Sequence, residues 1–269
     1  MLRDITLGQY YQTQSLIHSL DPRVKLGGTL LYIISLFFFR NFSGYMIAAL
    51  FLGIVIRLSH VPFKFMVKGM KAILFLLLIT VAFNLFLTPG EELVSFWKLT
   101  ITEEGLRSAV TMAVRLTLLI IGSSVMTLTT TPNNLTDGME KMMKPLKVIR
   151  VPVHEVAMIM SIALRFIPIL MEETDKIMKA QIARGADFES GNIVKRARAM
   201  VPLLVPLFIS AFRRANDLAM AMEARCYRGG EGRTKMKPLI YRRRDRMGYL
   251  FLAVYLAVSI SVGRLDVFW

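Results

Sequence analysis

The sequence predicts an all-α integral membrane protein with about five transmembrane helices and a basic cytoplasmic domain of long amphipathic helices. The 269 residues are 54% hydrophobic and have a mean hydropathy of +0.50, whereas soluble domains are about 45–50% apolar. The chain nevertheless carries a formal net charge of +15, from 34 basic and 19 acidic residues. Both facts agree if the charge lies in cytoplasmic segments, where Lys and Arg accumulate in membrane proteins. Because topology accounts for the charge, we expect no nucleic-acid partner.

The first two spans are predicted to form a hairpin of short helices. Residues 26–39 and 45–56 are apolar, and a polar stretch containing Arg40, Asn41 and Gly44 separates them. Each run is short against the roughly 20 residues that a span needs, so tilt or local thinning of the bilayer completes each crossing. One long helix is the alternative, and Gly44 with the preceding polar residues argues against it.

Three further apolar runs complete the five spans: 69–88, 106–128 and 247–263. Charge in the loops sets their orientation. The loop after the second span is basic, with Arg57, Lys64, Lys68 and Lys71, and the loop after the third is acidic, with Glu91, Glu92, Glu103 and Glu104 against Lys98. We therefore expect the amino terminus in the cytoplasm and the carboxyl terminus outside.

The segment 130–246 is expected to form a cytoplasmic domain between the membrane segment 1–129 and the last span in 247–269. It holds 22 of the 34 basic and 12 of the 19 acidic residues, a net charge of +10. Apolar runs at 156–171 and 200–212 contain prolines and charges that are costly inside a membrane. We expect long amphipathic helices lying under or partly in the membrane. Two additional spans stay open as an alternative, since they would leave the downstream loop charges unchanged.

Two helical runs in this segment share one pattern, in which Ile167 of the first run corresponds to Phe208 of the second. The second run carries an apolar stripe with steps of 4, 3, 4, 3 and 4, which keeps one helix face. Its small residues permit close crossing of another helix. The stripe is Leu204, Phe208, Ala211, Ala215, Leu218 and Met222, and the weaker first stripe includes Ile167, Leu170 and Ile177.

Each run ends in nearly the same three residues, Ala183-Arg184-Gly185 in the first and Ala224-Arg225-Cys226 in the second. An Arg at a helix carboxyl end complements the helix dipole and presents a rigid fork of donors to carboxylates. Plain helix capping explains either Arg alone. Two matched ends favour docking of a paired partner. Cysteine lacks the freedom of glycine at positive φ, so the sequence leaves open whether the second end, at Cys226, closes like the first.

No catalytic, metal or cofactor site is expected. The chain has one cysteine, three scattered histidines and no Gly-x-x-x-x-Gly-Lys-Ser/Thr nucleotide loop. Arg115 lies inside the fourth span and is either structurally paired in the bundle or involved in transport. Asn84 in the third span is expected to donate an interhelical hydrogen bond. The basic residues before the last span are expected to anchor it against anionic membrane lipid: Arg242, Arg243, Arg244 and Arg246.

The chain resembles the transmembrane T component of energy-coupling factor transporters, the family that includes the cobalt-transport permease. The resemblance rests on motifs spread over most of the chain. They are Leu20-Asp21-Pro22-Arg23 within 15–26, Leu128-Thr129-Thr130-Thr131-Pro132, Arg165-Phe166-Ile167-Pro168, Ala183-Arg184-Gly185 and Ala221-Met222-Glu223-Ala224-Arg225. Cys226 departs from the family, which usually has glycine there.

The resemblance implies a non-catalytic subunit of a bacterial inner-membrane importer. Two cytosolic ATP-binding-cassette ATPases would bind it, and a small membrane subunit would capture a vitamin or metal ion. By the same resemblance, Arg184 and Arg225 would each dock a coupling helix into a groove of one ATPase. A self-sufficient secondary transporter and a passive membrane scaffold are the alternatives. A secondary transporter should carry acidic residues within its spans, and the five predicted spans have none.

Overall fold

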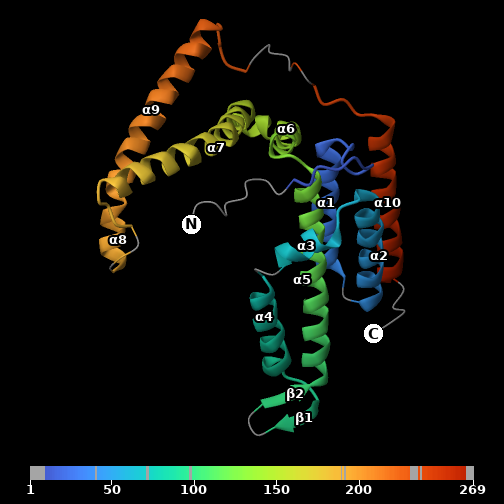
Figure 1. Ribbon diagram of the computed structural model, residues 1–269. Coiled ribbons are helices and arrows are strands. Elements are labelled where there is room, and N and C mark those ends of the chain that lie inside the picture. The colour runs from blue at the N-terminus through green and yellow to red at the C-terminus, as the bar shows by residue number, and fades with distance from the viewer. Residues whose placement is uncertain are drawn as a thin grey trace. The chain divides into compact units, whose positions relative to one another are not determined.

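The computed structural model describes residues 10–39, 41–70, 73–96, 99–188, 190, 192–230, 236 and 238–264. The chain divides into two compact units (Figure 1). The bundle unit comprises Gly8–Lys141 with Leu239–Trp269, and the arm unit includes Met142–Pro238. The predicted helical membrane architecture is confirmed. Four helices of the described ranges are long and apolar enough to cross a membrane: α2 (Phe42–Ser59), α5 (Glu103–Thr129), α7 (Val153–Ala183) and Arg243–Val262 of α10.

The bundle unit opens with the predicted helical hairpin. Helix α1 (Pro22–Phe38) has proline in its first turn and is capped by the Asp21 side chain, and α2 follows at Phe42–Ser59. A Cβ on Gly44 would lie 2.7 Å from the Phe39 ring, so glycine permits the close return of the chain. One continuous helix is therefore excluded. Arg40 lies outside the described residues.

The span expected at 69–88 is wrong at its beginning. The structure has two helices there, α3 (Phe63–Met70) and α4 (Leu74–Leu87). Lysines interleave with apolar residues in 63–70, which suits a short amphipathic helix, and Met66 is fully buried. Helix α4 keeps 14 residues, or about 21 Å at 1.5 Å per residue. Lys71, which belongs to the basic loop, lies outside the described residues.

A small β-hairpin that the sequence analysis did not predict joins α4 to α5. Strand β1 (Glu92–Phe96) pairs antiparallel with β2 (Leu99–Thr102). The Thr102 hydroxyl donates to the Thr88 carbonyl at 2.8 Å and accepts from the Gly105 amide at 3.0 Å. Thr102 thereby caps α5 and ties it to the end of α4. Lys98 lies outside the described residues.

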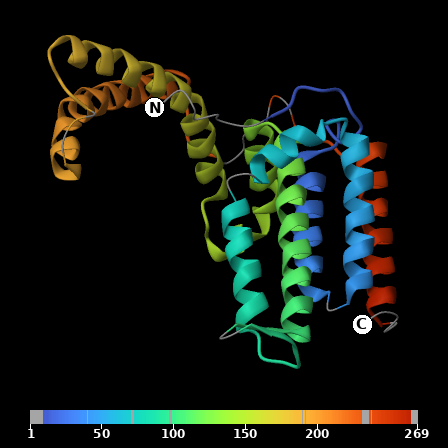
Figure 2. The same ribbon diagram turned by 60° about the horizontal axis from the view of Figure 1, so that its bottom comes forward.

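Helix α5 is the central element of the bundle unit, packing against α1, α2, α3 and α4. Helix α10 (Arg243–Arg264) packs against α1 and α2, and these helices run side by side in both Figure 1 and Figure 2. The core joins side chains from α1, α2, α5 and α10 and includes Tyr32, Leu36, Tyr45, Leu52, Leu118, Ile121, Leu252 and Tyr255.

The beginnings of α1 and α10 and the end of α5 lie at one end of the bundle, here called the α1-start end. The Asp21 amide donates to Asp245 Oδ1 at 2.7 Å. Lys25 Nζ donates to the Thr129 carbonyl at 2.8 Å. Helix α6 (Pro132–Met142) follows there, and a Cβ on Gly138 would lie 3.0 Å from Pro22. The α1–α2 turn and the β-hairpin mark the opposite end.

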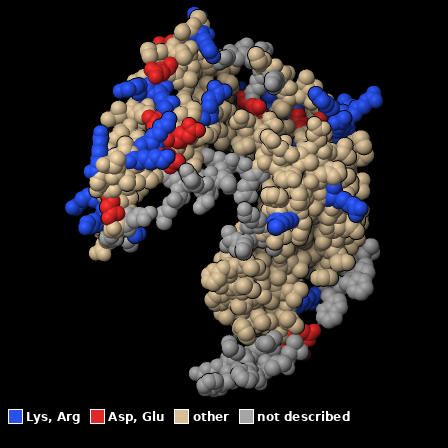
Figure 3. Space-filling view, viewed as in Figure 1, with Lys and Arg blue, Asp and Glu red and all other residues tan. Residues whose placement is uncertain are grey.

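The arm unit consists of a 3₁₀ helix, η2 (Lys144–Ile149), and three α-helices in its described residues. Helix α7 (Val153–Ala183) has 31 residues and α9 (Val201–Ala224) has 24. The short helix α8 (Ile193–Ala199) precedes α9. Figure 3 shows many Lys and Arg side chains over this unit, and further ones where α10 begins in the bundle unit.

Candidate functional site: two matched helix ends

The first helix end closes α7 with a pair of backbone hydrogen bonds. The Gly185 amide donates to the Ile182 carbonyl at 2.9 Å, and the Ala186 amide donates to the Gln181 carbonyl at 3.0 Å. Gly185 has φ of +88°. This combination is a Schellman motif. A Cβ on Gly185 would meet no atom within 4 Å, so backbone conformation rather than crowding favours glycine.

The second helix end repeats this closure at the end of α9. The Cys226 amide donates to the Glu223 carbonyl at 2.8 Å, and the Tyr227 amide donates to the Met222 carbonyl at 3.0 Å. Cys226 has φ of +55°. The second end, whose geometry the sequence left open, therefore closes in the same way as the first. A single non-glycine residue enters the left-handed region at a cost of about 1–2 kcal/mol, and two hydrogen bonds offset that cost.

Arg184 and Arg225 occupy the same position in the two ends. Their backbones agree closely, with φ and ψ of −90° and 7° for Arg184 and −92° and 13° for Arg225. Both residues are exposed. A guanidinium at this position lies at the negative end of the helix dipole and keeps its donors available to a partner. The flanking Ala183 and Ala224 are exposed as well.

A polar contact that the sequence analysis missed links α7 to α9. Glu173 Oε1 accepts from the Ser210 hydroxyl at 2.6 Å, and Glu173 Oε2 accepts from Arg214 Nη2 at 2.6 Å. Donation from Ser210 and from Arg214 lowers the pKa of the Glu173 carboxyl. Glu173 corresponds to Arg214 in the same way that Arg184 corresponds to Arg225, so the contact joins equivalent positions of the two helices. Opposite charges at the repeat offset were the sequence signal for this pair.

The two helices run antiparallel. Gln181, near the end of α7, donates through Nε2 to the carbonyl of Pro202, near the start of α9, at 3.3 Å. Arg184 and Arg225 lie equally far beyond the Glu173–Arg214 contact along their own helices. At 1.5 Å per residue each end lies about 17 Å from that contact, so the ends are separated by up to about 33 Å. The arrangement has local two-fold character.

The apolar stripes of α7 and α9 are partly exposed within this single chain. Leu204 is 39% exposed and Phe208 is 61% exposed, and Ala215 is exposed as well. The remaining stripe residues are half-buried: Ala211, Leu218, Met222, Ile167, Leu170 and Ile177. Exposed apolar side chains of this size favour contact with lipid or another protein.

Arg115, in the bundle unit, makes structural contacts. Its Nε and Nη2 donate to the Tyr45 hydroxyl at 2.9 and 2.6 Å. Tyr45, which is 2% exposed, donates in turn to the Phe39 carbonyl at 3.1 Å. Arg115 therefore ties α5 to the α1–α2 turn. This geometry agrees with the structural alternative of the sequence analysis.

Asn84 does not make the expected interhelical hydrogen bond. Its side-chain Nδ2 donates to the Thr80 carbonyl one turn earlier in α4, at 2.8 Å. The backbone carbonyl of Asn84 accepts from the Thr88 hydroxyl at 2.7 Å. The amide reaches its own helix because a carbonyl one turn earlier is within range of a short polar side chain.

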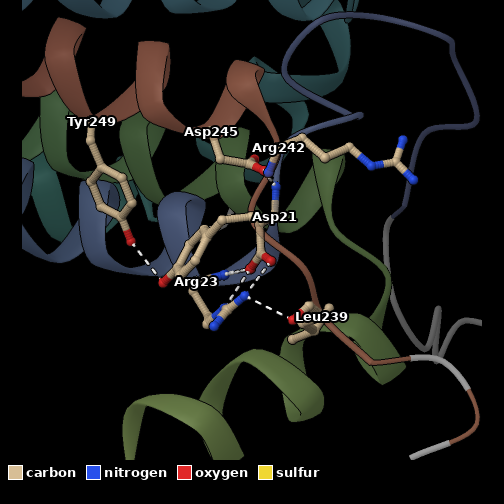
Figure 4. Close-up of polar contacts among 7 residues, drawn as sticks. Asp21, Arg23, Leu239, Arg242, Asp245 and Tyr249 are labelled. Atoms are coloured by element: carbon tan, nitrogen blue, oxygen red, sulfur yellow. Dashed lines mark hydrogen bonds and ion pairs between the residues drawn. The ribbon is translucent and has the colours of Figure 1, made fainter.

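The Leu20-Asp21-Pro22-Arg23 motif forms a polar junction between the beginnings of α1 and α10 (Figure 4). Arg23 donates from Nε and Nη2 to the two Asp21 oxygens at 3.0 and 2.8 Å, and also to the Leu239 carbonyl at 3.2 Å. Asp245, which is 2% exposed, accepts from the Asp21 and Arg242 amides, both at 2.7 Å. The guanidinium of Arg23 also lies 3.7 Å from the centre of the Tyr241 ring.

Within the described ranges, His, Cys, Asp and Glu side chains form no group of three or more that could hold a metal ion. The candidate functional site therefore consists of the two matched helix ends.

Comparison with known proteins finds relatives along nearly the whole chain. Residues 13–236 match the family model described as "Cobalt transport protein", CbiQ. The chain is 56% identical over 262 residues to the "Energy-coupling factor transporter transmembrane protein EcfT" of Clostridium kluyveri, covering 97% of each chain. It is 52% identical over 263 residues to the protein of that name from Thermosediminibacter oceani, again covering 97% of each. The Bacillus subtilis protein of that name is 46% identical over 261 residues, covering 96% of this chain and 98% of its own.

Proposed function

This chain belongs to the CbiQ family of cobalt transport proteins, within its EcfT members, and we propose that its two matched helix ends dock two cytosolic ATP-binding-cassette ATPases. Membership makes it an integral membrane component of an energy-coupling factor transporter. The proposal adds how energy enters the component. ATP-driven movement of the ATPases displaces the Arg184 and Arg225 ends, and α7 and α9 transmit that displacement to the membrane bundle.

The observation that carries this proposal is the repeated backbone geometry of the two ends. Each has an exposed Arg at the helix carboxyl cap, followed by a left-handed residue and the same two hydrogen bonds. Backbone amides can cap the helix carbonyls whatever side chains are present. Capping therefore does not require an identical exposed guanidinium at both ends. A partner with two similar grooves accounts for both. Carboxylates in those grooves suit the planar fork of arginine.

A bound pair of ATPases also fits the arrangement of α7 and α9. Local two-fold character presents equivalent ends in equivalent orientations, which a two-fold related pair of subunits can engage simultaneously. The Glu173–Arg214 contact links α7 to α9, so a displacement of one helix end is transmitted to the other.

The contact between Asp21 and Asp245 supports placing α7 and α9 outside the membrane. Both residues lie at the α1-start end, so the chain crosses the membrane an even number of times between them. Helices α1, α2, α4 and α5 supply four crossings. Helix α7 alone would make the number odd, and α9 carries Arg213, Arg214, Asp217 and Glu223, charges that are costly inside a membrane. Both helices then lie on the side where α1 and α10 begin.

Loop charge supports assigning that side to the cytosol. Arg23, Arg57, Lys64 and the arginines of 242–246 belong to the α1-start end. Glu91, Glu103 and Glu104 belong to the opposite end, next to the β-hairpin. The amino terminus is then cytoplasmic and the carboxyl terminus outside.

Substrate capture is assigned to a separate small membrane subunit that binds a vitamin or a metal ion. In support, helices α1, α2 and α4 contain no Asp or Glu, and the acids of α5 and α10 lie in their first turns. These helices thus offer no intramembrane carboxylate for ion coupling.

The test is substitution of the two arginines in the complete complex. Arg184→Ala and Arg225→Ala should each abolish most ATP-driven uptake, while substrate binding to the capture subunit is unchanged. Loss of a buried charged contact at an interface costs about 2–5 kcal/mol, so ATPases should also co-purify less well. Arg213→Ala, an exposed arginine inside α9, is the matched control.

Wild-type uptake in the Arg184→Ala/Arg225→Ala double variant would refute docking by these ends. Uptake by the purified chain alone in vesicles, driven by an ion gradient, would instead identify a secondary transporter. ATPases that bind tightly while their hydrolysis stays uncoupled from uptake would identify a passive scaffold.

A further inference from the structure

The bundle unit contains a cavity of about 350 Å³ among α1, α2, α5 and α10. At the α1-start end the cavity is lined by Lys25, Thr129 and Arg244, and this end is here called its mouth. Tyr32, Phe51 and Leu252 also line the cavity. Lys25 and Tyr32 are about two turns of α1 apart, so the cavity reaches about 10 Å into the bundle.

The interior of the cavity is almost entirely apolar. Glycines make room in its wall: a Cβ on Gly28 would meet its nearest atom, in Leu252, only at 4.0 Å. The ring of Phe51, which lines the cavity, stacks on the rings of Tyr255 and Phe251 with centroid distances of 4.2 and 5.0 Å. Apolar cavities of about 300–1,000 Å³ with a few polar groups at one edge are typical ligand sites.

Two cationic side chains, Lys25 and Arg244, line the mouth. Lys25 Nζ donates to the His18 and Thr129 carbonyls at 3.1 and 2.8 Å, and an ammonium has a third donor. Arg244 adds a guanidinium. Of the two carboxylates nearby, Asp21 is engaged by Arg23 and Asp245 by two backbone amides. The residues 242–246 contribute four arginines.

We propose that this cavity binds one anionic phospholipid, with an acyl chain in the apolar interior and the phosphate at Lys25 and Arg244. Charge complementarity selects this occupant, because a basic mouth at a membrane surface above an apolar shaft matches an anionic headgroup on a hydrocarbon chain. The lipid bridges α1 and α10, whose beginnings meet at the Asp21–Asp245 contact, and fills space that the helices leave open. The site is independent of the docking ends in the arm unit.

The experiment is native mass spectrometry of the purified full chain after delipidation, with add-back of dioleoyl phosphatidylglycerol or dioleoyl phosphatidylcholine. One phosphatidylglycerol should bind per chain, at least about tenfold more tightly than phosphatidylcholine, which corresponds to about 1.4 kcal/mol. Arg244→Gln should remove the preference for the anionic lipid. Arg243→Gln, the neighbouring arginine that does not line the cavity, should keep it.

Filling the cavity separates a cavity site from general surface attraction. Gly28→Leu should abolish tight binding of either lipid, and Gly28→Ala, whose Cβ fits without displacement, should weaken it while the chain folds normally. Inorganic phosphate should compete weakly, because it lacks the acyl chain. Equal binding of both lipids, equal effects of Arg243→Gln and Arg244→Gln, or unchanged binding in both Gly28 variants would overturn the proposal. So would a co-purified polypeptide occupying the site in place of lipid.

Discussion

Glu173 Oε2 lies 2.6 Å from Arg214 Nη2, and the two residues hold the same position in the repeat that relates α7 to α9. In a two-fold arrangement, equivalent positions meet only near the axis. The ion pair therefore lies near the local axis of the arm unit, and the two matched helix ends lie at equal distances on either side of it.

The first prediction concerns this ion pair. Glu173→Gln and Arg214→Gln should each lower ATP-driven uptake by at least about fivefold, a typical lower bound for coupling between sites. The arms lose their link, while the arginine ends remain able to bind. Uptake and ATPase co-purification are measured on the same preparations. The charge-reversed Glu173→Arg/Arg214→Glu variant should regain some of the uptake, and Arg213→Gln is the control. Reduced co-purification that parallels the loss of uptake would contradict a linking role.

The second prediction concerns Cys226. Glycine there removes the cost of a left-handed side chain, about 1 kcal/mol, and a β-branched residue increases it. Hydrogen exchange at the Tyr227 amide, which closes the motif, should slow about fivefold in Cys226→Gly and accelerate in Cys226→Val. At the other end Gly185→Ala should accelerate exchange at Ala186. Unchanged exchange in all three would mean that these bonds do not report the left-handed residue.

The third prediction concerns the Tyr45 hydroxyl, which links α5 to the α1–α2 turn. Tyr45→Phe removes the hydroxyl that accepts from Arg115 Nε and Nη2 and leaves only the longer contact of Nη2 with the Phe39 carbonyl, at 3.5 Å. A half-buried guanidinium that loses its acceptor costs about 1–3 kcal/mol, so the melting temperature in detergent should fall by several degrees. Tyr255→Phe, which loses a hydrogen bond to Ser35 instead, controls for loss of a buried hydroxyl. An unchanged melting temperature would show that Arg115 finds another acceptor.

The fourth prediction concerns pH. Burial raises the pKa of the Asp21 carboxyl, but hydrogen bonds from Arg23 lower it by more, so the net pKa lies below its usual value. Asp21 therefore stabilises the fold fully above the unfolded pKa, near 3.9, and this stability is lost as pH falls through the folded pKa. The stability difference between wild type and Asp21→Asn, followed by thermal unfolding from pH 7 to pH 3, should shrink at the acid end. Arg23→Gln should flatten this dependence. A difference independent of pH would contradict the assignment.

Much of the bundle could be predicted because hydropathy and turn residues report directly on spans. Asn41 separates α1 from α2 because its backbone is extended, and Gly44 lets the start of α2 lie close to Phe39. The span expected at 69–88 was wrong at its beginning because, by hydropathy, Gly69 and Met70 look like part of the apolar run. In the structure they end the short helix of 63–70, which its lysines make amphipathic. The β-hairpin was missed because strands of five and four residues carry little periodic signal.

The helix ends were located correctly because they follow a repeat that is visible in the sequence. The sequence left the geometry of the second end open, since the φ preference of a residue is an average over contexts and the hydrogen bonds of Tyr227 and Cys226 override it here. Glu173 and Arg214 were missed because an apolar stripe directs attention to packing faces, and their pairing depends on the antiparallel register. Asn84 shows the same limit: a polar residue in a span has partners in its own helix that sequence spacing does not rank.

The two matched helix ends have the same backbone geometry and differ in their side chains. Gly185 is replaced by Cys226, the single cysteine of the chain, and Ala186 by Tyr227. Because the two backbones match, they give two different ATPases no basis for binding one end rather than the other. The side chains that differ must supply that distinction, and they include a thiol and a phenol that only the second end carries. The exposed Cys226 thiol can also be labelled with a reporter dye at the second end alone. The partner bound at each end can then be identified without altering either arginine.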